Sequence, residues 1–401
     1  MCRLKSSTAV VRMDDGLYQL QPFVVPQWAQ HLNNIPKHIV KLSNLRTPIH
    51  KWRLPEVPTG FDVYIKRDDL TGTELSGNKV RNLQILFAEA LASGARHVVT
   101  GGGPQSGHCR AVSIVCRYLG IQPHVVIEGV DKREDLGSAG NTLLYRLAGS
   151  QIYLAPYEGY EHFTRRVRNM QKYISDHYQE PCYCIPVGGS AVEGVFGFVA
   201  MFQELLEQGL HENFDDIVVT IATGGTAAGL ALSNYLTGSK LSYICWLTLS
   251  GPMYCRVHAM TIALRRSELE ENIDRLLTGL GAGVRCADIL HVIEGHVGAG
   301  YGTASTDVLE YITRVSSSTG ILLDPYYTGK AALGLARELR DNPGRFKGTR
   351  ILFVHTGGIF GLFNGEMDRV VDSPGSPTNR MTSWLVEDQS PLQQTTHTTP
   401  S

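Results

Sequence analysis

The chain has 401 residues, of which 43% are hydrophobic and 19% are charged, and its formal net charge is −1. These values are typical of a globular protein with two domains, or with one large domain that carries a smaller one. The balanced charge gives no reason to expect a nucleic acid or an anionic membrane as a partner. No apolar run is long enough to cross a bilayer.

Eight cysteines are present, but none forms a CxxC pair, and we expect no metal site. Cys109 follows His108 and could be a nucleophile or a ligand, although a small buried hydrophobic side chain is the more frequent role. The first residues, MCRLKSSTAVVR, lack the apolar segment of a secretory signal and resemble a mitochondrial presequence only faintly. We therefore expect a cytoplasmic location, with the mitochondrion as the alternative.

Short β-branched runs alternate with helical stretches once an irregular, proline-containing lead-in at residues 1–55 has ended. Most of the runs are continuously apolar, as parallel strands buried on both faces are. The alternation predicts an α/β fold with an open, mostly parallel sheet. The predicted strands are 61–66, 97–100, 124–127, 151–154, 182–186, 217–222, 243–247 and 351–354, and the predicted helices are 79–92, 106–119, 195–207, 226–236 and 329–339.

Lys79 is the first residue of the predicted helix 79–92. The field at a helix N-terminus disfavours a cation, so such a lysine loses its proton more easily and can act as a nucleophilic amine. The apolar residues of this helix fall on one face. A solvated surface lysine is the alternative that this residue alone leaves open.

Two glycine-rich segments each join a predicted strand to a predicted helix. Segment 222–229 offers backbone N–H groups that suit one phosphate monoester, and it lacks the spacing of a P-loop or of a dinucleotide-binding turn. A glycine-rich turn without a ligand is the alternative that this segment alone leaves open. Segment 100–108 could hold a carboxylate, although Ser106 could equally act only as a helix cap. Segments 324–330 and 355–358 could line a cleft or be plain turns. Such loops meet at the carboxyl edge of an open sheet, so together they suit pyridoxal 5′-phosphate (PLP) and an amino acid.

These segments resemble, in order, the motifs of the D-cysteine desulfhydrase and 1-aminocyclopropane-1-carboxylate deaminase family, within the tryptophan-synthase-β-like, fold type II PLP enzymes. The matching stretches lie within residues 45–363 and are KRDDLTG (66–72), SGNKVR (76–81), GGPQSGH (102–108), PVGGS (186–190), TGGTAAGL (223–230), YTGKA (327–331) and FVHTGG (353–358).

The resemblance implies an architecture as well as a cofactor. It implies a homodimer whose subunits hold PLP in a cleft between two domains, the smaller inserted in the larger. The implied boundaries are a lead-in at 1–44, a large domain at 45–80 and 190–371 and a small domain at 81–189. The composition of residues 372–401, rich in Ser, Thr and Pro, predicts a disordered tail.

The resemblance also implies roles for single residues. Lys79 is the Schiff-base lysine, and Ser106, Tyr327 and, by a looser match, Tyr301 act with it in catalysis. The residues implied for the cofactor, besides Lys79, are Asn78, Thr223, Gly224, Gly225, Thr226 and Thr356, and those for the substrate are Ser106, Gly107 and His108.

Four positions bear on the substrate. Thr328 and Thr356 stand where deaminases carry Glu and Leu, which favours the desulfhydrase branch, whereas Gly107 and Asn82 replace Asn and Lys of many members. These departures could alter substrate contacts and weaken phosphate binding. The predicted reaction is β-elimination, which converts D-cysteine to pyruvate, hydrogen sulfide and ammonia, with Lys79 as the base. The alternatives are the deaminase, an eliminase or racemase acting on serine-like amino acids, and a PLP-binding protein without turnover.

Overall fold

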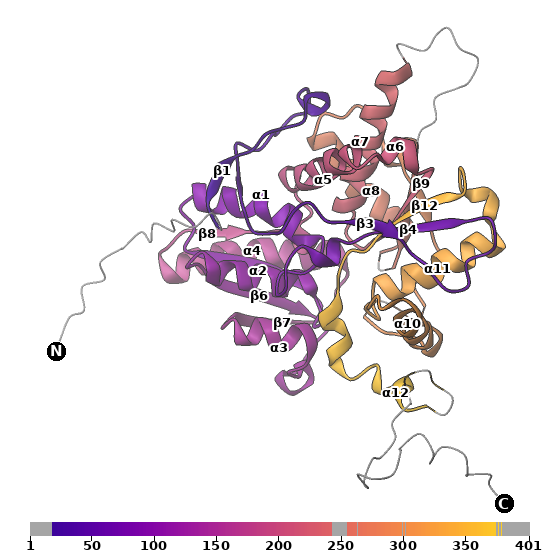
Figure 1. Ribbon diagram of the computed structural model, residues 1–401. Coiled ribbons are helices and arrows are strands. Elements are labelled where there is room, and N and C mark those ends of the chain that lie inside the picture. The colour runs from indigo at the N-terminus through magenta and orange to yellow at the C-terminus, as the bar shows by residue number, and fades with distance from the viewer. Residues whose placement is uncertain are drawn as a thin grey trace, which may run out of the picture.

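The structure is a computed structural model that describes residues 18–242, 255–262, 264–298, 300, 302–373, 376 and 378. Two mainly parallel sheets with helices on their faces form the predicted α/β fold. In Figure 1 the smaller sheet and its helices lie on the left in purple and magenta, and the larger sheet lies on the right. Among the described residues, no helix has the length and apolar content that a membrane span requires.

The smaller sheet has four parallel strands, and all four predicted strands of this region are confirmed to within two residues at each end. Helices α1, α2 and α3 pack on one face and α4 on the other. In sheet order the strands are β7 (Gln151–Ala155), β6 (Gln122–Glu128), β5 (His97–Gly102) and β8 (Cys182–Cys184), and the helices are α1 (Lys79–Ala92), α2 (Gly107–Tyr118), α3 (Gly140–Leu147) and α4 (Tyr160–Tyr178).

The larger sheet has six strands, of which only the edge strand β3 is antiparallel to its neighbour. The chain leaves this sheet after β4 and returns to it at β9, as expected if a smaller domain is inserted, although the boundaries themselves stay a prediction. In sheet order the strands are β11 (His291–Ile293), β10 (Arg256–Thr261), β9 (Asp216–Ile221), β12 (Arg350–Val354), β4 (Asp62–Lys66) and β3 (Ile49–Lys51).

Helices cover both faces of the larger sheet. One face carries α5, α7 and α8, and the other carries α10 and α11. Their bounds are α5 (Phe196–Glu207), α7 (Gly225–Ser242), α8 (Arg266–Gly279), α10 (Thr306–Thr319) and α11 (Thr328–Asp341), and the short helices are α6 (Leu210–Asn213), α9 (Cys286–Ile289) and α12 (Asp368–Val371).

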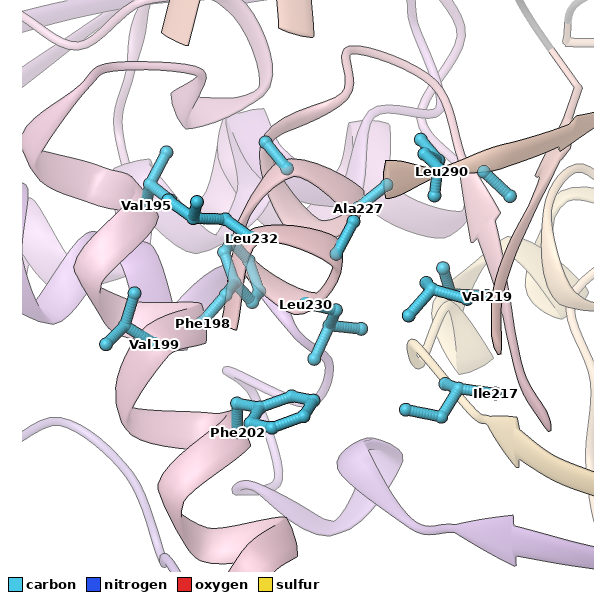
Figure 2. Packing of buried hydrophobic residues seen from close by; sticks show 14 of the residues in the cluster. Val195, Phe198, Val199, Phe202, Ile217, Val219, Ala227, Leu230, Leu232 and Leu290 are labelled. Carbon is cyan, nitrogen blue, oxygen red and sulfur yellow. The ribbon is translucent and has the colours of Figure 1, made fainter. Parts of the chain in front are cut away.

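The core between β9, α5 and α7 fixes where α7 begins. Figure 2 shows Phe198 and Phe202 of α5 facing Leu230 of α7, with Ile217 of β9 beside them. A Cβ at Gly229 would lie 2.4 Å from the Cβ of Phe198, so the two helices approach closely only because α7 has a glycine there. This packing holds the N-terminus of α7 at the end of β9.

Several predictions from the sequence need correction. The lead-in is not wholly irregular, because it contains β3 and an antiparallel pair, β1 (Leu20–Pro22) and β2 (His38–Val40). These strands have three residues each, too few for a periodic pattern. Strands β10 and β11 were not predicted, and the predicted strand 243–247 lies outside the described residues. Most of the predicted tail, from 372 onward, lies outside them as well.

Candidate active site

A cavity that is partly open to solvent lies between the carboxyl edges of the two sheets. Loops that follow β4, β5, β9 and β12 line it. Tyr301 lies outside the described residues. All the other predicted site residues line this cavity: Asn78, Lys79, Ser106, Gly107, His108, Thr223, Gly224, Gly225, Thr226, Tyr327 and Thr356.

Lys79 is the first residue of α1, as predicted. Its Nζ donates a hydrogen bond to the carbonyl of Gly188, at 3.1 Å. Burial lowers the pKa of this amine from 10.5 to about 8, because the surrounding protein disfavours the charged form. The neutral form is therefore far more populated near neutral pH than in an ordinary lysine, as a nucleophilic amine or a base requires.

The loop before Lys79 packs against the end of β12. The backbone N–H of Asn78 donates to the carbonyl of Thr356 at 3.1 Å. Gly77 has φ of +118°, and a Cβ there would lie 2.8 Å from the same carbonyl oxygen. A glycine is thus required for this approach, which brings Lys79 and Thr356 into one cavity.

The segment from Thr223 to Thr226 forms a cradle at the N-terminus of α7. The hydroxyl of Ser190 donates to Thr223 Oγ1 at 2.6 Å, and the amide of Asn78 donates to Thr226 Oγ1 at 2.9 Å. Gly224 has φ of +97°, which turns the chain into the helix. Backbone N–H groups and hydroxyls without a carboxylate among them are the donors that a phosphate monoester prefers.

Two further observations test whether this cradle fits PLP. A Cβ at Gly188 would lie 2.5 Å from Thr223 Oγ1, so the glycine keeps the 187–190 turn close beside the cradle. Thr220 lines the cavity, and its hydroxyl is buried without a hydrogen-bond partner among the described residues. These residues fit PLP. The easily deprotonated lysine fits its aldehyde, the anion cradle fits its phosphate, and the unsatisfied hydroxyl fits its polar ring.

Ser106 caps helix α2, because its Oγ accepts a hydrogen bond from the N–H of Cys109 at 3.1 Å. The capping interpretation is therefore confirmed, and the same side chain also faces the cavity. His108 Nε2 lies 2.9 Å from Thr100 Oγ1, and burial lowers the pKa of its ring to about 3, which keeps it neutral. Cys109 is fully buried, and burial raises the pKa of its thiol to about 12, in keeping with a hydrophobic role.

The wall formed by the C-terminal third contains a carboxylate that the sequence did not single out. Asp324 accepts hydrogen bonds from the N–H groups of Tyr326, Tyr327 and Thr328, at 2.7–2.9 Å, and from the Thr328 hydroxyl at 2.6 Å. Burial raises the pKa of this carboxyl group. Thr328 does not line the cavity, since its side chain points to Asp324, whereas Thr356 does line it. The Asp-Pro pair before α11 was the available signal.

Gly188 and Asn82 are both neighbours of the site, and the sequence indicated no role for Gly188 and only part of the role of Asn82. Gly188, whose carbonyl binds Lys79, belongs to the PVGGS stretch that the sequence had matched without a role. Asn82 donates to the carbonyl of Gly189 at 3.0 Å, and its Oδ1 is buried without a partner among the described residues. It therefore supports the turn beside the cradle and does not line the cavity itself.

Comparisons with known proteins agree with this geometry. A family model described as "Pyridoxal-phosphate dependent enzyme" matches residues 40–357. The chain is 39% identical to the bifunctional D-cysteine desulfhydrase/1-aminocyclopropane-1-carboxylate deaminase, mitochondrial, of Arabidopsis thaliana, over 93% of this chain and 91% of that protein. It is 34% identical to a putative 1-aminocyclopropane-1-carboxylate deaminase of Thermotoga maritima, over 81% and 97%.

A solved structure described as an ACC deaminase homologue has a TM-score of 0.69 and 30% identity, and the match covers 83% of this chain and 94% of that one. The resemblance inferred from the motifs is thus confirmed. The chain belongs to the family of pyridoxal-phosphate dependent enzymes.

Proposed function

We propose that this enzyme catalyses β-elimination on a small amino acid, and that D-cysteine is converted to pyruvate, hydrogen sulfide and ammonia. The observation that carries the proposal is one cavity that contains the Lys79 amine, the cradle at the N-terminus of α7 and the N-terminus of α2. A bound amino acid needs the three groups together: a base, a place for the cofactor phosphate and a place for its carboxylate.

The residues that would hold PLP follow from the fit described above. The segment 223–226 would receive its phosphate, Lys79 its aldehyde, and Thr356 would lie beside its ring, with Asn78 joining the lysine loop to the cradle. Bound PLP supplies an electron sink for the charge that develops on the substrate Cα.

The remaining steps rest on side chains of the chain itself. Lys79 takes the proton from Cα, and its lowered pKa allows this near neutral pH. Ser106 and the N–H groups of Gly107 and His108 orient the substrate carboxylate at the N-terminus of α2. Either Tyr327 or Tyr301 handles protons near the leaving group.

A deaminase activity on 1-aminocyclopropane-1-carboxylate is the second candidate, because both relatives named above carry that activity in their names. The structure offers a hydroxyl, Thr356, at the cavity wall, and the carboxylate of Asp324 is already saturated by four donors. Hydrosulfide is a good leaving group, whereas opening a carbon ring demands a stronger electron sink. This difference favours the desulfhydrase reaction.

A substrate panel tests the proposal. D-cysteine, L-cysteine, D-serine and 1-aminocyclopropane-1-carboxylate are incubated with the PLP-loaded enzyme, and sulfide, ammonia and 2-oxo acids are measured. Sulfide and pyruvate from D-cysteine are expected. Release of a 2-oxo acid from the cyclopropane acid alone would favour the deaminase, and no product from any compound would indicate a PLP-binding protein without turnover.

Assembly and location complete the proposal. We propose a homodimer, which light scattering tests, and a cytoplasmic location. The name of the Arabidopsis relative places that protein in mitochondria, and this keeps the mitochondrion as the alternative. Fractionation of cells that express the full chain distinguishes the two compartments.

A further inference from the structure

Arg110 is a buried cation in the cavity wall. The charge of Glu74 acts on it from a distance, but no ion pair to Arg110 forms among the described residues. Only 2% of its surface is exposed, and it lines the same cavity as Lys79. Within the part of the chain that the structure describes, no carboxylate lies within ion-pair distance of its guanidinium, whereas the equally buried Arg81 pairs with Asp68 and Glu204. A buried charge without a direct ion-pair partner is costly, so an anion brought by a ligand would stabilise it.

The protein contacts of Arg110 leave part of the guanidinium free. Its Nε donates to Asn141 Oδ1 at 3.0 Å, its Nη2 to the Ser76 carbonyl at 2.9 Å, and its Nη1 to the Glu74 carbonyl. Phe360 lies with its ring centroid 4.8 Å from Cζ. Three of the five N–H groups are thus used, and two have no partner among the described residues. Burial lowers the pKa to about 10, so the group stays positive at neutral pH.

Gly107 leaves this guanidinium open to the cavity. A Cβ at position 107 would meet only Arg110 Nη2, at 3.7 Å, and nothing else within 4 Å. A longer side chain on this residue would therefore extend over the guanidinium. Gly107 is also the first residue of α2, so the free N–H groups of the helix N-terminus and the positive charge face the same space.

We propose that Arg110 binds the α-carboxylate of the amino-acid substrate, and that Gly107 exposes it for this purpose. The inference rests on the proposed function, because it places an amino acid in this cavity. A guanidinium beside a helix N-terminus selects ligands that carry a carboxylate next to their amine and disfavours simple amines.

Glycine and methylamine test the proposal, since they differ only by the carboxylate and neither can undergo β-elimination. Both are titrated into the PLP-loaded enzyme, and binding is followed by the visible absorbance of the cofactor. In Arg110→Gln we expect the Kd for glycine to rise about 30-fold or more, as for a buried charge pair that loses one partner, while the Kd for methylamine stays within about twofold. Arg117→Gln, on the same helix but exposed, serves as the control and should change neither value.

We compare the ratio of the Kd for glycine to the Kd for methylamine within each variant. A general loss of folding or of cofactor affects both Kd values alike and therefore leaves this ratio unchanged. In Arg110→Lys, which keeps the charge but loses the planar fork, the ratio should change by a smaller factor. Equal weakening of both ligands in Arg110→Gln would mean that Arg110 only packs the wall, and it would overturn the proposal. The proposal would also be overturned if the ratio of the glycine Kd to the methylamine Kd stayed the same in Arg110→Gln and Arg110→Lys as in the unsubstituted enzyme. Because the titration needs no turnover, it remains decisive even if the substrate panel shows no product.

Discussion

Replacing Lys79 by methionine should stabilise the cofactor-free protein at neutral pH. Folding lowers the pKa of this amine from 10.5 to about 8, so the protonated lysine destabilises the folded state below pH 8. Since a tenfold change in proton affinity corresponds to about 1.4 kcal/mol, the charge destabilises the folded protein by about 3 kcal/mol. The lost hydrogen bond to Gly188 offsets about 1 kcal/mol of this, so we expect a net gain of about 2 kcal/mol.

The pH dependence separates this effect from better packing. Between pH 8 and 10.5 the folded state binds fewer protons than the unfolded state, so the stability of the unsubstituted chain rises with pH in this window. The methionine variant lacks this rise. The free energy of unfolding of both cofactor-free proteins is therefore measured with urea at pH 7 and near pH 10.5. The part of the stability difference between them that disappears at high pH is the contribution of the lysine charge.

A control variant and the cofactor complete the assay. Lys172→Met, at an exposed position on α4, should change stability by less than about 0.5 kcal/mol at either pH. Added PLP should stabilise the chain with Lys79 and have much less effect on the methionine variant. The argument from a partly buried, easily deprotonated amine would be refuted if Lys79→Met lowered stability at pH 7, or if it raised stability equally at both pH values.

Three further substitutions test the scaffold of the site, each by urea unfolding. Glu204→Gln should lower stability by about 3–5 kcal/mol, because it leaves the buried Lys66 without its ion-pair partner and removes one of the two partners of Arg81. Glu207→Gln, in an exposed ion pair, should change stability by less than about 1 kcal/mol. Gly197→Ala should cost about 1–3 kcal/mol, since its Cβ would lie within 2.2 Å of the carbonyl oxygen of Arg81 on α1. Phe202→Ala should cost about 3–5 kcal/mol through the cavity it leaves in the core shown in Figure 2.

The sequence predicted α1 with the observed bounds because its apolar residues recur with helical spacing. It did not predict that the polar side chains of this helix would be buried as well. Arg81 pairs with Asp68 and Glu204, and Gln84 accepts from the N–H of Leu42 at 3.1 Å. Asp68 lies 13 residues from Arg81, but Glu204 lies 123 residues from it, and Leu42 lies 42 residues from Gln84. Periodicity records only which residues avoid water, and it cannot show which polar residues find partners inside.

Strand β10 was not predicted, again because its buried polar residues find partners that the local sequence does not reveal. Its sequence contains Arg256 and His258, which interrupt the apolar run, so no strand was predicted there. In the structure His258 is fully buried, with Nε2 2.8 Å from Asp216 Oδ1 and Nδ1 2.8 Å from His291 Nδ1. A histidine in a parallel strand is acceptable once its two nitrogens have partners on neighbouring strands. That condition depends on sheet order, which local sequence does not contain.

The site itself depends on a contact between two glycines, and this explains why its parts could be predicted more easily than its assembly. Gly77 precedes Lys79 by two residues, and Gly357 follows Thr356. A Cβ at Gly357 would lie 2.5 Å from the Cα of Gly77. The two backbones therefore touch directly, and a side chain at either position would push the amine away from the wall that carries Thr356. The motifs identify the groups that carry the chemistry. The distance between those groups is set by Gly77 and Gly357, and a glycine has no side chain whose chemistry would point to this role.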